Sequence, residues 1–141
     1  MALGHRSSWM ATRGASSGLR MTFGAACKPH PSKVDKGGED SYFGCSRGGS
    51  RGFSCFGVSD GVGGSATAAI DPGVFSRELL RRCHGAMVEV GADIAAGVDG
   101  DAAVGLDAQL VRALREAGDG LAAATPRIEG SATLLLGGLD P

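Results

Sequence analysis

The spacing of apolar residues changes once along this chain, and that change limits the folds that it can form. From Phe75 onward, apolar residues recur at steps of three and four, the period of a helix with one buried face. Asp71 and Pro72 precede this run and suit the N-cap and first position of a helix. Gly91 is a typical helix end. We therefore predict a long amphipathic helix between these residues.

A second helix is predicted further along the chain. Asp107 is its expected N-cap, and Gly118 and Gly120 are its expected stop. The residues between the two helices, 91–105, are rich in alanine and glycine and predict a loose connection. The apolar side of this second helix consists of Leu110, Val111, Leu114 and Ala117.

Short strand-like runs lie on both sides of the helical part. Leu19–Cys27, Asp40–Cys45 and Phe53–Ser59 precede it, and Ser131–Leu136, which is too apolar to face water, follows it. A glycine-rich turn joins the second run to the third and predicts a hairpin. Three strands, two helices and one strand are grouped and do not alternate, so the expected class is α+β.

Size and charge exclude several classes of protein. The chain has 141 residues, which suits one domain, and its formal net charge is −1. That charge gives no strong field for nucleic acid, and no apolar run reaches the roughly 20 residues of a membrane span. The four cysteines form no C-x-x-C pair, so we expect buried thiols in a reducing compartment.

The N-terminal end has a different composition from the rest. Residues 1–34 contain five lysines and arginines and no acidic residue, and residues 1–18 are rich in serine. Arginine- and serine-rich, acid-free starts are typical of mitochondrial or chloroplast transit peptides, whereas no secretory apolar region is present. We expect residues 1–18 to be a transit peptide, which would place the protein in a mitochondrion or chloroplast, or else a disordered tail.

Two acidic clusters stand at the ends of the predicted hairpin strands. Glu39 and Asp40 begin one strand, and Asp60 and Gly61 follow the other. Successive strand residues point to opposite faces, so Glu39 and Asp40 should not both face one site. A carboxylate beside the bare backbone of a glycine offers hard oxygen ligands, which suit Mg²⁺ or Mn²⁺. Gly61 is expected to take a positive φ and to let the backbone approach a ligand closely. Solvated loop charges and a plain D-G turn are the alternative.

Three motifs in order resemble one known family. KPHPSKVDKGGEDSYF, FGVSDGVGG and GSATLLLGGLD are similar to segments of the PPM family, the Mg²⁺/Mn²⁺-dependent serine/threonine protein phosphatases. The resemblance is strongest to the organellar branch, with its H-P-x-K-x-x-x-G-G-E-D and D-G-V-G-G motifs. It implies roughly the first half of a phosphatase β-sandwich flanked by antiparallel helices. Residues 19–141 are thus expected to be the N-terminal part of a truncated phosphatase domain.

The resemblance also implies roles for individual residues. Asp60 resembles the carboxylate that bridges two metal ions, Glu39 a direct ligand, and Gly61 a carbonyl ligand of the same ion. Asp40 resembles the acid that hydrogen-bonds metal-bound water. Many family members have a phosphate-gripping arginine where this chain has Asp35; we expect Lys36, ahead of Lys33, to contact phosphate instead. A structural role is expected for Gly130, Ser131 and Thr133.

The expected activity is hydrolysis of phosphoserine and phosphothreonine in proteins by metal-activated water. The family completes its site with two further aspartates that have no counterpart here, so we expect weak or no turnover. A non-catalytic module that binds a phosphoprotein or a cation is the alternative. A nucleotide cradle is disfavoured, because DGVGGSA lacks the lysine of the G-x-x-x-x-G-K-[ST] motif.

Overall fold

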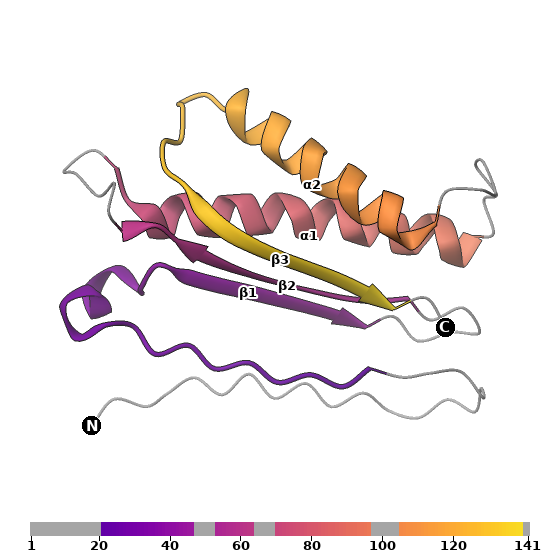
Figure 1. Ribbon diagram of the computed structural model, residues 1–141, viewed down its shortest axis with the longest axis horizontal. Helices are drawn as coiled ribbons and strands as arrows, with labels where there is room; N and C mark the ends of the chain where they lie inside the picture. Colours follow the sequence, from indigo (N-terminus) through magenta and orange to yellow (C-terminus); the bar gives the residue numbers. More distant parts are fainter. Residues whose placement is uncertain (1–20, 47–52, 64–69, 97–104, 140–141) are drawn as a thin grey trace.

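The computed structural model describes residues 21–46, 53–63, 70–96 and 105–139, and it has the expected α+β architecture. Two helices lie on one side of a three-stranded antiparallel sheet (Figure 1). The predicted transit peptide and the turn between the hairpin strands lie outside the described residues. No helix in the described ranges is long and apolar enough to cross a membrane. The elements are η1 (Pro31–Lys36), β1 (Asp40–Ser46), β2 (Ser54–Gly61), α1 (Pro72–Ala96), α2 (Leu106–Ala122) and β3 (Ala132–Leu139).

The strand order is β1-β2-β3, with both neighbouring pairs antiparallel, which confirms the predicted hairpin. β2 is longer than the sequence predicts, because Asp60 pairs with Thr133 and Gly61 with Ala132 on β3. The alternative of a plain D-G turn is therefore wrong at these residues, which remain in the strand. Pairing on both sides also buries most of β2, whereas β1 lies at the edge of the described sheet.

The helices lie where they were predicted, but they do not end at the glycines predicted to end them. Asp71 caps α1 as expected, with its carboxylate accepting the Gly73 N–H at 2.9 Å. Gly91 does not end the helix: a Cβ there would lie 2.7 Å from Cδ1 of Phe53, so this glycine permits close packing. Similarly, α2 starts after Gly105 and not after the predicted cap Asp107, and it continues to Ala122.

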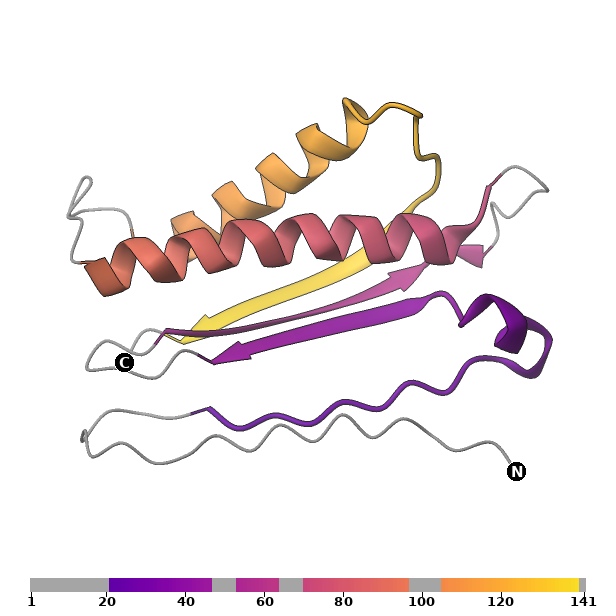
Figure 2. The ribbon, with the colours of Figure 1, turned by 180° about the vertical axis from the view of Figure 1, so that it is seen from behind.

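The core lies between the helices and the inner face of the sheet (Figure 2). Burial confirms the cysteine prediction for Cys55 and Cys83, and it raises the pKa of the Cys83 thiol. Cys27 is exposed and Cys45 half-buried, so the prediction is wrong for the first and only partly right for the second. The buried apolar residues are Phe53, Cys55, Leu79, Leu80, Cys83, Met87, Val90, Ala113, Ala117 and Leu121.

The outer face of the sheet carries an exposed apolar row. Tyr42 pairs with Val58, which pairs with Leu135, and these side chains are 40%, 47% and 61% exposed. β3 therefore faces water on one side, contrary to the expectation from its apolar sequence. The predicted first strand is also wrong over its described residues, because residues 21–30 are extended without strand pairing. Phe23 from this segment covers Gly44 on the same outer face.

Candidate metal centre

Asp40 and Asp60 face each other across β1 and β2. The Gly61 N–H donates to the Glu39 carbonyl at 3.1 Å, so the neighbouring Asp40–Asp60 pair is of the non-hydrogen-bonded type. In such pairs the Cα atoms are about 4.5 Å apart and the side chains approach closely. Both residues are exposed on the outer face of the sheet. The hairpin register thus brings two carboxylates from the two clusters together.

The electrostatics of this pair reflect its crowding. Partial desolvation, then the charge and hydrogen bond of Asp60, raise the pKa of the Asp40 carboxyl. Glu39 adds to this rise, and the Lys33 ammonium opposes it. Thr133 is exposed in the same cross-strand row, next to Asp60. The row therefore offers several oxygen atoms and an excess of negative charge.

Glu39 lies at the same corner of the sheet, but its carboxylate has another partner. It forms an ion pair with Lys33 from η1, and its side chain is 17% exposed. A Cβ on Gly63 would lie 2.9 Å from Glu39 Oε2 and 3.0 Å from Lys33 Nζ. The absence of a side chain at Gly63 therefore leaves room for this ion pair. Lys36, the residue predicted to contact phosphate, is exposed at the end of η1.

Glycines shape the corner in two ways. Gly37 and Gly38 have φ values of 78° and 82°, the left-handed region that favours glycine, and they turn the chain from η1 into β1. Gly61, in contrast, does not have a positive φ. A Cβ at Gly61 would lie 2.4 Å from the carbonyl oxygen of Pro72, so its small size lets the start of α1 approach. The expected positive φ at Gly61 is thus wrong.

Arg77 is a residue of this corner that the sequence analysis missed. Its Nη1 donates to the Gly38 carbonyl at 3.1 Å and ties α1 to the turn before Glu39. Ser76, its neighbour, donates to the Ser59 carbonyl at 3.2 Å and shares a 2.7 Å hydrogen bond with Ser41. Helical periodicity places such residues on a face of α1, but it does not reveal which strand they meet.

The donor chemistry at this corner fits a hard divalent cation, because carboxylates and backbone carbonyls are its preferred ligands. The arrangement is nevertheless incomplete: the described residues contain no group of three or more histidine, cysteine, aspartate or glutamate side chains that would hold a metal ion. Asp40 and Asp60 form a pair, and the Glu39 carboxylate is engaged by Lys33. The corner therefore offers oxygen donors that suit a divalent cation, but the described residues do not complete a set of ligands.

Comparison with known proteins shows similarity to plant protein phosphatases. The chain is 44% identical over 78 residues to probable protein phosphatase 2C 71 of Oryza sativa subsp. japonica, covering 53% of this chain and 15% of that protein. It is 43% identical over 74 residues to probable protein phosphatase 2C BIPP2C1 of the same subspecies, covering 50% and 11%. Probable protein phosphatase 2C 80 of Arabidopsis thaliana is 44% identical over 62 residues, covering 44% and 14%.

These matches support the resemblance to protein phosphatases of the 2C type over about half of the chain. The matched part is a small share of each relative, from 11% to 15% of the three named proteins. No family model matches the chain, and no solved structure matches it. The activity of the relatives therefore comes to this chain as a proposal.

Proposed function

We propose that this chain contributes part of the metal site of a serine/threonine protein phosphatase of the 2C type. The observation that carries the proposal is the juxtaposition of Asp40 and Asp60, two like charges placed opposite each other on the exposed face of the hairpin. Like charges directly opposite in a sheet are destabilising unless something neutralises them. Similarity to proteins named phosphatase 2C supports a divalent cation as that neutralising partner.

Each residue at the corner has a role in this proposal. Asp60 and Glu39 would hold Mg²⁺ or Mn²⁺ through carboxylate oxygens, and Gly61 through its carbonyl. A bound divalent cation would lower the pKa of water and neutralise phosphate charge. Asp40, held against Asp60, would orient a water molecule and accept its proton. Lys36 would make the phosphate contact that the resemblance assigns to an arginine.

Turnover by this chain alone should be weak or absent. The described residues provide fewer carboxylates than a two-metal hydrolase site requires. The substrate class of the whole protein would be phosphoserine and phosphothreonine in proteins. An organellar location, in a mitochondrion or chloroplast, remains part of the proposal and is supported by the acid-free composition of residues 1–34.

Metal binding tests the proposal more directly than activity. Titration of the chain with Mn²⁺ by calorimetry should show a binding isotherm that Asp60→Asn and Glu39→Gln each weaken at least about tenfold, since each removes a charged ligand. Glu89→Gln, which removes an exposed charge from α1, is the control and should leave binding unchanged. Equal affinity in the Asp60 and Glu89 variants would overturn the assignment of the site.

The alternative is a module that binds a phosphoprotein or a cation without hydrolysis. The incomplete carboxylate group in the described residues favours it for the chain in isolation. An assay with Mn²⁺ and p-nitrophenyl phosphate or a phosphoserine peptide separates the two. Turnover that requires metal and is lost in Asp60→Asn supports the phosphatase and contradicts the expected inactivity; binding without turnover supports the module.

A further inference from the structure

A hollow of about 380 Å³ lies beside the acidic corner, between α1 and the edge strand β1. Arg77, Arg81 and His84 line it from α1. Asp40, Tyr42 and Phe43 line it from β1, so the hollow shares Asp40 with the candidate metal centre. We name this hollow the β1–α1 groove after these six residues; apart from Asp40, none of them has a role in the metal chemistry proposed above.

The exposed edge of β1 supplies one wall of the β1–α1 groove. The hydrogen bond from Gly61 to Glu39 fixes which residues of β1 direct their backbone toward β2. In an antiparallel pair these alternate with residues whose N–H and C=O groups point away from the partner strand. Asp40, Tyr42 and Gly44 are therefore the outward-pointing residues. In the part of the chain that the structure describes, β1 pairs only with β2. Phe23 covers Gly44, so the stretch from Asp40 to Phe43 is the part of this edge that can take an added strand.

The helical wall of the groove is basic. Arg77, Arg81 and His84 are spaced by four and three residues and thus lie on one face of α1. The Arg77 bond to Gly38 uses one of the five N–H donors of a guanidinium. Arg81 binds Glu78 through Nε and Nη2 at 2.7 Å, yet its side chain is 67% exposed. Glu78 also pairs with Arg82, so the arginines on this stretch of α1 outnumber its one glutamate.

The floor of the groove holds these basic groups in place. The His84 ring lies 4.7 Å, centroid to centroid, from the ring of Phe43, with an angle of 30° between the two planes. Leu80 also lines the hollow and is buried. An apolar floor with cationic side chains above it and backbone donors and acceptors along one side suits an extended acidic peptide.

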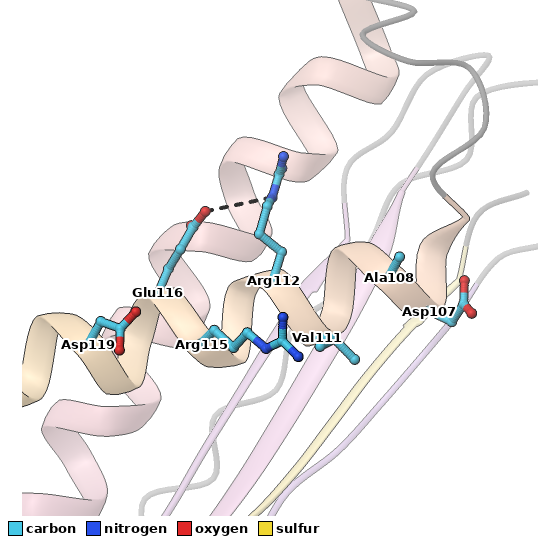
Figure 3. Close-up of a pocket in the computed structure, with 7 residues that line it drawn as sticks. All are labelled: Asp107, Ala108, Val111, Arg112, Arg115, Glu116 and Asp119. Carbon is cyan, nitrogen blue, oxygen red and sulfur yellow. Dashed lines mark ion pairs between the residues drawn. The ribbon is translucent and has the colours of Figure 1, made fainter.

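A second hollow, on α2, lacks the features that would suit an acidic peptide (Figure 3). All seven of its lining residues come from one helix, and the charged ones are Asp107, Arg112, Arg115, Glu116 and Asp119. There Arg112 is engaged by Glu116 at 3.7 Å. That surface has no strand edge, and its three acids outnumber its two arginines, so it does not favour an acidic segment. It does provide an arginine for a matched control.

We propose that the β1–α1 groove binds an acidic extended segment of the phosphoprotein substrate as an added strand along β1. The assignment of this segment to a substrate rests on the proposed phosphatase function. Arg77 lies level with Gly38 and His84 level with Phe43, so the basic face follows β1 away from the metal centre. Seven helical residues span about 10.5 Å, which equals about three residues of an extended chain. The groove thus selects acidic residues within about three positions of the phosphorylated one.

Fluorescence anisotropy with the full chain tests this proposal in the presence of EDTA, where the metal centre plays no part. The probe is a labelled phosphoserine peptide with aspartate at the three positions on each side. The comparison peptide has asparagine at those positions. We expect the aspartate peptide to bind at least about tenfold more tightly, and Arg81→Gln to weaken it about threefold, as the loss of a partly exposed charge contact does. Arg112→Gln should leave its affinity unchanged.

Two results would overturn the proposal: equal affinity for the two peptides, or equal weakening by Arg81→Gln and Arg112→Gln. Displacement of the peptide by a single-stranded oligonucleotide at equal charge would also overturn it, since the groove would then be a general polyanion surface. Circular dichroism of each variant shows whether it is folded, and Arg81→Glu adds a gain-of-function readout, because it should reverse the preference toward a lysine-containing peptide.

The outcome is separable from that of the proposed function. If Asp60→Asn and Glu89→Gln bind Mn²⁺ equally well but the chain still prefers the aspartate peptide, the metal centre is rejected and the groove remains an acidic-peptide site. If Asp60→Asn weakens Mn²⁺ binding but the two peptides bind equally well, the groove alone is rejected.

Discussion

Replacing Asp60 with asparagine should stabilise the folded chain in the absence of divalent cations. The structure places Asp40 and Asp60 directly opposite each other, and the pKa of Asp40 is raised by partial desolvation and by Asp60. Two unit charges about 4 Å apart in water repel by about 1 kcal/mol. Because both side chains are exposed, solvent screening keeps the gain at or below about 1 kcal/mol. The asparagine amide can also donate a hydrogen bond to the Asp40 carboxylate.

The pH dependence of this gain has a defined sign. A raised pKa means that folded Asp40 binds a proton more readily than unfolded Asp40, so its contribution to stability is present at low pH. That contribution is lost as the pH rises through the raised pKa, when both carboxylates ionise and repel. The advantage of Asp60→Asn should therefore be largest near neutral pH and should fade as the pH falls through the raised pKa of Asp40, where that carboxyl takes up a proton.

Thermal unfolding followed by circular dichroism in EDTA measures the effect. A gain of about 1 kcal/mol raises the melting temperature of a domain of this size by a few degrees. Raising the salt concentration should reduce the gain, because exposed charges are screened. Glu89→Gln removes a negative charge at an exposed position of α1 and should change the melting temperature much less. A lower melting temperature for Asp60→Asn, or the same shift for Glu89→Gln, would refute the electrostatic argument.

Two other substitutions test the packing and charge around the same corner. Gly61→Ala should lower the free energy of unfolding by about 1–3 kcal/mol, because its Cβ would lie 2.4 Å from the Pro72 carbonyl oxygen. Gly85→Ala should instead stabilise α1, because a Cβ there meets nothing within 4 Å. Chemical denaturation of the two variants measures both effects. Arg81 and Arg82 hold the pKa of Glu78 below its ordinary value, so its contribution is present at neutral pH and is lost as the pH falls through that lowered pKa. Glu78→Gln should therefore be less stable than the parent at pH 7, by at most about 1 kcal/mol, with the difference disappearing in acid; a constant difference across the pH series would argue against the ion pairs.

The sequence predicted the elements of the fold better than their ends. Apolar spacing is a direct consequence of burial on one face, so α1, α2 and the β1–β2 hairpin could be predicted from it. Glycine is less informative, because it occurs both at the ends of helices and where helices pack closely against other residues. Gly91 lies within α1 against Phe53, and a Cβ at Gly120 would lie 2.6 Å from Nη1 of Arg82. Such contacts depend on residues far away in the sequence.

The acidic corner could be located from the sequence, but its pairings could not. Strand alternation predicted that Glu39 and Asp40 would point apart, and the structure confirms that they contact different partners: Lys33 and Asp60. The register that sets Asp40 opposite Asp60 depends on a long turn whose residues do not specify it. Arg77 reaches Gly38 from 39 residues away, a contact that no local pattern encodes.

The rigidity of this corner strengthens the case that its opposed carboxylates serve a ligand. An exposed like-charge pair on a mobile loop would simply move apart. Here β2 is paired on both sides, and Ser76 of α1 bonds both the Ser59 carbonyl and the Ser41 hydroxyl, beside Asp60 and Asp40. The backbone is thus held by neutral hydrogen bonds that do not relieve the repulsion between the two acids. A backbone held in this way keeps the two carboxylates opposed, as the proposed cation site requires. The Asp60→Asn comparison and the Mn²⁺ titration test this arrangement without and with the cation.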